Sequence, residues 1–108
     1  MPSFEDMPPV PSAERLRDDP ASNRFVLETD GGEAFAVYRR IDGLLVISHT
    51  EVPAALRGRG IGSRLAKAVF DHARSRGERI VPACSFIADW AHRHPDEEAV
   101  LAGRPTPP

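Results

Sequence analysis

The segment RGRGIG, Arg57 to Gly62, combines three glycines with two arginines. Glycine leaves backbone N–H groups open to a bound oxyanion and can adopt the positive φ that a ring of N–H donors requires. An apolar stretch with helical spacing begins at Ile61, so the segment directly precedes a helix whose first N–H groups and dipole attract anions. The sequence therefore predicts a phosphate or pyrophosphate site at Gly58, Gly60 and their neighbours.

Two well-known phosphate loops fit this segment poorly. A P-loop requires lysine and then serine or threonine after its last glycine, whereas Gly62 is followed by Ser63 and Arg64. The dinucleotide motif G-x-G-x-x-G requires glycine at position 63 and a parallel βαβ unit, but the apolar runs before the loop are those of hairpins. Both the P-loop and the dinucleotide interpretation are disfavoured.

His49 and Glu51 are the candidate acid–base residues beside the loop. They are two positions apart on a predicted strand, so their side chains share one face of it and either could relay a proton from an amine. The structural alternatives are a surface ion pair of Glu51 with Arg57 or Arg59, and a core-edge position for His49, which alternates with Ile47.

Cys84, the only cysteine, is the third candidate. A single cysteine is most often inert core filling. Cys84, however, ends a predicted strand just before the helical segment SFIADW, where a helix N-terminus would lower the pKa of the thiol. The other histidines (His72, His92 and His94) are interpreted as solvated helix residues, and no group of residues has metal-ligand spacing.

The elements that position these residues follow from periodicity. The turn Asp42-Gly43 between apolar runs indicates a hairpin within a three-stranded antiparallel meander. A helix with an apolar stripe begins at Ile61 and ends at Gly77, and a second helix is stopped by Pro95. The expected strands are 24–29, 33–41, 44–52 and 79–84, and the expected helices are 61–76 and 85–94. The fold class is therefore α+β, with the helices packed on one sheet.

The length of 108 residues fits one domain, predicted at 23–102. Residues 1–22, rich in proline, are expected to be a disordered tail, and residues 103–108 a flexible terminus. The net charge of −2 and the pI near 6.1 argue against bulk nucleic acid or an anionic membrane as partner. One cysteine, no signal-like start and no long apolar run predict a cytoplasmic protein.

The pattern Arg-Gly-x-Gly-x-Gly at 57–62 resembles the pyrophosphate loop of the GNAT superfamily of acyl-CoA-dependent N-acyltransferases. Together with HTEV (49–52), VPACSF (81–86) and the His94-Pro95 pair, it is similar to a small single-domain bacterial subfamily, over residues 23 to about 101. The resemblance implies acetyl-CoA as co-substrate, no metal, and an amine acceptor that is a small molecule, a polyamine or a protein lysine. It leaves open whether the protein is a monomer or a homodimer.

The resemblance also implies roles for individual residues. Backbone at Val52 would pair with the pantetheine arm, and Cys84 would receive the acyl group or protonate the leaving thiolate. The coenzyme loop would comprise Arg57, Gly58, Arg59, Gly60, Ile61, Gly62 and Ser63.

The chain departs from the superfamily in two ways. It lacks the tyrosine that many members carry on the second helix, because its one tyrosine, Tyr38, lies on the middle strand. It also lacks the last strands that wall the amine pocket, so the acceptor groove is expected to be open or completed by a partner subunit. A module that binds acyl-CoA without turnover is therefore the alternative function. Nucleic-acid binding through Arg57, Arg59 and Arg64 is a third and less favoured interpretation.

Overall fold

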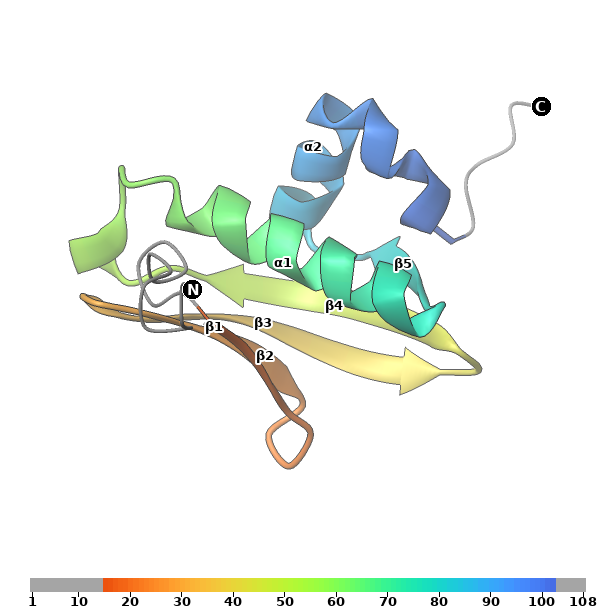
Figure 1. Ribbon diagram of the computed structural model, residues 1–108, viewed down its shortest axis with the longest axis horizontal. Helices are drawn as coiled ribbons and strands as arrows, with labels where there is room; N and C mark the ends of the chain where they lie inside the picture. The colour runs from red at the N-terminus through yellow and green to blue at the C-terminus, as the bar shows by residue number, and fades with distance from the viewer. Residues whose placement is uncertain (1–14, 103–108) are drawn as a thin grey trace, which may run out of the picture.

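In a computed structural model, which describes residues 15–102, one five-stranded sheet carries two main helices (Figure 1). The strands are β1 (Arg15–Asp19), β2 (Arg24–Thr29), β3 (Gly32–Ile41), β4 (Leu44–Glu51) and β5 (Arg79–Pro82). The helical segments are η3 (Ala54–Leu56), α1 (Ile61–Arg76), α2 (Ser85–Arg93) and η4 (Pro95–Val100). The predicted α+β class is confirmed.

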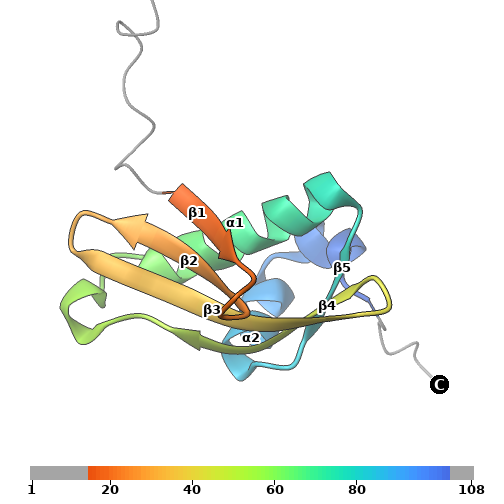
Figure 2. The ribbon, with the colours of Figure 1, turned by 90° about the horizontal axis from the view of Figure 1, so that it is seen from below.

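The strand order in the sheet is β1-β2-β3-β4-β5. Neighbours from β1 to β4 pair antiparallel, and β5 pairs parallel to β4. The helices lie on one face of the sheet (Figure 1), and α1 lies behind the strands when the sheet is seen from below (Figure 2). The main core therefore forms between that face and the helices, from side chains such as Phe25, Leu45, Val69, Phe70 and Trp90.

Local sequence signals place most of these elements correctly. Asp42 and Gly43 both adopt positive φ, 51° and 79°, which closes the predicted hairpin between β3 and β4. Gly77 ends α1 in the left-handed conformation expected of a glycine C-cap. The predicted apolar stripe of α1 is buried throughout, at Ile61, Leu65, Ala66, Val69, Phe70 and Ala73.

The first strand corrects the predicted domain boundary. Strand β1 lies inside the segment 1–22, for which the sequence predicts a tail, so the folded region begins before residue 23. Its sequence, RLRDD, has one apolar residue because an edge strand on this sheet needs only Leu16 for the core. Asp18 then accepts a hydrogen bond from the buried hydroxyl of Tyr38, a contact no sequence pattern shows. Residues 1–14 and 103–108 lie outside the described range.

A buried carboxylate, Glu97, ties η4 to α1. Glu97 is 2% exposed, accepts a hydrogen bond from Lys67 Nζ at 2.9 Å and is also bonded by Arg74. Burial alone would raise the pKa of Glu97, but the hydrogen bonds from the two cations outweigh it and hold the pKa below its usual value. The ionised carboxylate is therefore the form that the fold stabilises.

Replacing Glu97 with glutamine is expected to lower the free energy of unfolding at pH 7 by about 1–2 kcal/mol, since a charged hydrogen-bond acceptor is lost. Because the folded pKa is depressed, this contribution is present above the unfolded value of about 4.3 and disappears as pH falls through the folded pKa. Urea unfolding of the unaltered protein and of Glu97→Gln at pH 7 and pH 3.5 tests this. Asp89→Asn, at an exposed position of α2, is the control, with a change within about 0.5 kcal/mol. An equal deficit of Glu97→Gln at both pH values would contradict the expectation.

Candidate active site

A cleft opens where β4 and β5 part. Their parallel pairing runs from Leu44 and Arg79 to Ile47 and Pro82 and ends there, while β4 continues to Glu51. Pro82 has no N–H to extend the ladder. The cavity at this point measures about 410 Å³ and is lined by His49, Thr50, Glu51, Val52, Arg57 and Phe86.

A β-bulge at Ser48 decides which side chains of β4 face the helices. Tyr38 pairs with Ile47 and Val37 with His49, so Ser48 is an extra residue on β4. Beyond it Thr50 pairs with the buried Ala36 and takes the helix-facing side, since directly paired residues share a face. His49 therefore does not lie on the same face of β4 as Ile47.

His49 and Glu51 both lie on the opposite face of β4 from Ile47. The predicted sharing of one face is confirmed, because His49 Nε2 and Glu51 Oε1 are 3.4 Å apart. Their side chains are 58% and 57% exposed, so the core-edge interpretation of His49 is wrong. Both side chains are therefore accessible to solvent, and both line the cleft.

Cys84 is the N-cap of α2, two residues beyond the end of β5. The half-buried sulfur lies 3.7 Å from the Thr50 hydroxyl. Burial raises the pKa of this thiol, but the N–H groups of Ile87, Phe86 and Thr50 and the Thr50 hydroxyl together outweigh it, so the pKa lies below its usual value. No capping hydrogen bond to the sulfur forms, so the N–H groups of α2 act as nearby partial positive charges. The predicted position at a helix N-terminus is confirmed.

The glycine loop forms the left-handed turns predicted for it. Gly58 and Gly60 have φ values of 84° and 74°, and Gly60 is the N-cap of α1. The Arg64 N–H donates to the Gly60 carbonyl at 3.1 Å, and it is the first N–H group in α1 that bonds back to the loop. No side chain caps the helix. The N–H groups of the three preceding residues, Ile61 to Ser63, are therefore available to an anion.

The loop lines a second cavity, of about 270 Å³. This cavity shares Val52, Arg57 and Phe86 with the cleft beside β4, so the two are adjacent. Phe86 packs closely on the loop, because a Cβ at Gly62 would lie 2.9 Å from its ring. Arg59 differs from Arg57: its guanidinium lies beside Gly31, in the turn between β2 and β3.

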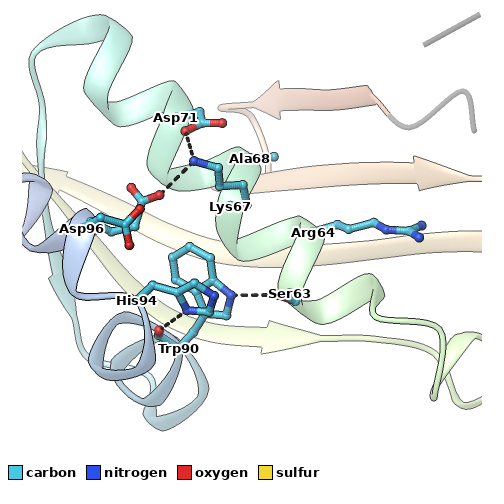
Figure 3. Close-up of a pocket in the computed structure, with 9 residues that line it drawn as sticks. Ser63, Arg64, Lys67, Ala68, Asp71, Trp90, His94 and Asp96 are labelled. Atoms are coloured by element: carbon cyan, nitrogen blue, oxygen red, sulfur yellow. Dashed lines mark hydrogen bonds and ion pairs between the residues drawn. The ribbon is translucent and has the colours of Figure 1, made fainter. Parts of the chain in front are cut away.

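A third cavity, about 530 Å³, lies between α1 and the segment formed by α2 and η4 (Figure 3). Trp90 Nε1 donates to the Ser63 hydroxyl at 2.9 Å, and His94 stacks on the Trp90 ring at 4.0 Å between centroids. His94 Nδ1 donates to the Trp90 carbonyl at 2.7 Å. Ser63 and Lys67 line this cavity together with Arg64, Ala68, Asp71, Trp90, His94, Asp96 and Glu97.

Among the cavity residues that sequence reasoning does not identify as site residues are Thr50, Phe86 and His94. The solvated position predicted for His94 is wrong, because the ring is half-buried and held by Trp90. The i, i+4 spacing of Trp90 and His94 is the available signal. The sequence gives no such signal for Thr50, because the orientation of its side chain depends on the bulge.

Tyr38 lies away from the cleft, as expected. Its ring is 2% exposed, and its hydroxyl bonds Asp18 and accepts from Arg40. Burial is the main reason that its pKa is raised. Within residues 15–102 no three His, Cys, Asp or Glu side chains gather as metal ligands. None of the helices in that range has the length and apolarity to span a membrane.

The sequence profile of the GCN5-related N-acetyltransferases matches residues 24–100. Protein NATD1 of Bos taurus is 32% identical over 84 residues, which cover 75% of this chain and 74% of the relative, and the Homo sapiens protein is 31% identical with the same coverage. Similarity thus extends to vertebrates. The solution structure of a GCN5-like protein from Staphylococcus aureus superposes with a TM-score of 0.64 and 29% identity, covering 83% of this chain and 89% of that one. The chain belongs to the GCN5-related N-acetyltransferase family.

Proposed function

We propose that this protein transfers an acetyl group from acetyl-CoA to a primary amine. The observation that carries the proposal is the run of three adjacent cavities from Glu51, across the glycine loop, to His94. The first two share Val52, Arg57 and Phe86, and the second and third share Ser63. An elongated ligand with a thioester arm, a pyrophosphate and a nucleoside fits that arrangement.

The loop supplies what a pyrophosphate needs. The N–H groups of Ile61, Gly62 and Ser63 and the positive end of the α1 dipole converge on one cavity, and Arg57 adds a full charge beside it. Ile61 contributes only its backbone, because its side chain is buried. The thioester arm then enters the cleft beside β4, which Val52 and Phe86 line.

Acetyl transfer requires one group that accepts a proton from the amine and another that acts on the thioester, and we assign these roles to different residues. The His49–Glu51 pair accepts the proton that the ammonium group must lose before its nitrogen attacks the thioester carbonyl. A C–N bond forms and the C–S bond of the thioester breaks. Cys84 serves in one of two ways: it protonates the leaving thiolate, or it first takes the acetyl group and then passes it to the amine. Both routes require the sulfur near the thioester carbonyl.

Calorimetry is expected to detect acetyl-CoA binding below millimolar concentration. Acetyl-CoA at 100 times its dissociation constant should also stabilise the protein by about 2.7 kcal/mol in thermal unfolding. Acetyl-pantetheine, which lacks the pyrophosphate and the nucleoside, is the control ligand and should bind much more weakly. If acetyl-CoA fails to bind at millimolar concentration, the proposal is wrong.

A module that binds acyl-CoA without turnover is the second candidate. It is favoured by one observation: His49 and Glu51 are more than half exposed, so the acceptor side of the cleft is open. Release of free CoA in the presence of a polyamine, a lysine peptide or a small primary amine decides between the two. Tight binding of acetyl-CoA with no release above the rate without protein would select the binding module.

A further inference from the structure

The Thr50 hydroxyl lies between Cys84 and the cleft. Thr50 lines the cavity beside β4, and its Oγ1 lies 3.7 Å from Cys84 Sγ, which is half-buried at the N-terminus of α2. The Thr50 hydroxyl is therefore next to both the Cys84 sulfur and the cavity. No part of the proposed reaction described above uses it.

The bulge at Ser48 puts Thr50 in that place. Without the extra residue, the alternation that buries Leu45 and Ile47 would turn position 49 toward the helices, and an imidazole would face that side. With it, His49 moves to the exposed face and a neutral hydroxyl meets the sulfur. The backbone irregularity thus selects the polar partner of Cys84.

A hydroxyl suits both protonation states of a thiol. It carries one donor and two acceptor sites, so it can donate to a thiolate or accept from a thiol. Donation to the charged state is the stronger of the two bonds. The titratable or charged side chains that line the cleft are Arg57 at the loop and the His49–Glu51 pair on the far face of β4. The groups that face the sulfur itself are the Thr50 hydroxyl and the N–H groups of Thr50, Phe86 and Ile87.

We propose that Thr50 is a positioning residue: its hydroxyl holds the Cys84 sulfur beside the cleft and stabilises the thiolate. The inference depends on the proposed function in one respect only, because it is the proposed function that gives Cys84 a part in acyl transfer. The hydrogen bond and its effect on ionisation do not depend on acetyl-CoA. The two ideas can therefore fail separately.

The test measures the rate of Cys84 alkylation by iodoacetamide against pH, in the full chain without ligand. Thr50→Val keeps the shape of the side chain and removes the hydroxyl, and is expected to raise the pKa of the thiol by about one unit. Thr50→Ser, which restores the hydroxyl, should return the profile close to that of the unaltered protein. Ser75→Ala removes an exposed hydroxyl from α1, one bonded to the His72 carbonyl, and should leave the profile unchanged.

An unchanged pKa in Thr50→Val, with unfolding temperature preserved, would overturn the proposal. The same holds if Thr50→Ser shifts the profile as far as Thr50→Val does, because packing and not the hydroxyl would then be responsible. Should acetyl-CoA fail to bind while Thr50→Val still shifts the profile, the proposed function falls and the role of Thr50 stands.

Discussion

Replacing Cys84 with alanine is expected to lower kcat for acetyl transfer by about 10²–10⁴-fold, the usual contribution of a positioned acid–base group. The sulfur lies at the N-terminus of α2, beside Thr50, where the surrounding N–H groups favour the thiolate. Alanine removes both the nucleophile and the proton donor. Steady-state release of CoA from acetyl-CoA, with an amine in excess, measures the loss.

The control for this change is coenzyme affinity. Cys84→Ala should bind acetyl-CoA within about threefold of the unaltered protein, because the residues proposed to hold the pyrophosphate lie in the loop. Acetylation of Cys84 seen by mass spectrometry after mixing with acetyl-CoA alone would select the covalent route, and its absence with turnover intact would select the acid. Full turnover by Cys84→Ala would remove the residue from the reaction.

Gly60→Val is expected to weaken acetyl-CoA binding by about 10- to 100-fold. Gly60 is the N-cap of α1 with φ of 74°, a conformation that costs a residue with a side chain about 1–2 kcal/mol. The space around its Cβ position is open, so the cost arises from the backbone and not from a clash. Relief of that strain would turn the N–H groups of the loop away from the pyrophosphate. Isothermal titration with acetyl-CoA gives the change in affinity.

Gly77→Val is the matched control for the loop variant. Gly77 ends the same helix with φ of 70°, again in open space, so valine there imposes the same backbone strain at the opposite end of α1. Both variants should lose similar stability in urea unfolding. Only the loop variant should lose affinity; an equal loss in both would mean that general destabilisation, and not the loop, governs binding.

The features that the sequence predicts correctly are those that depend on local backbone geometry. The turn at Asp42-Gly43, the stripe of α1 and its end at Gly77 depend on conformations that a few neighbouring residues fix. The left-handed turns at Gly58 and Gly60 are of the same kind, whereas anion binding by this loop stays a prediction. Cys84 is placed correctly at a helix N-terminus because the helical stretch begins at the next residue.

What the sequence determined by itself was therefore the order of the elements from β2 onward, the glycine loop and the position of Cys84. The tertiary structure decided the rest: that Arg15–Asp19 completes the sheet, that His94 stacks on Trp90, and that Thr50 meets the sulfur in place of His49. The physical reason is that an edge strand and a bulge are set by pairing with a neighbouring strand. The strands concerned pair across short turns, β1 with β2 and β3 with β4, but neither an edge strand nor a bulge leaves a clear periodic trace in its segment. Thr50 then meets Cys84 through a contact between residues 34 apart in the chain.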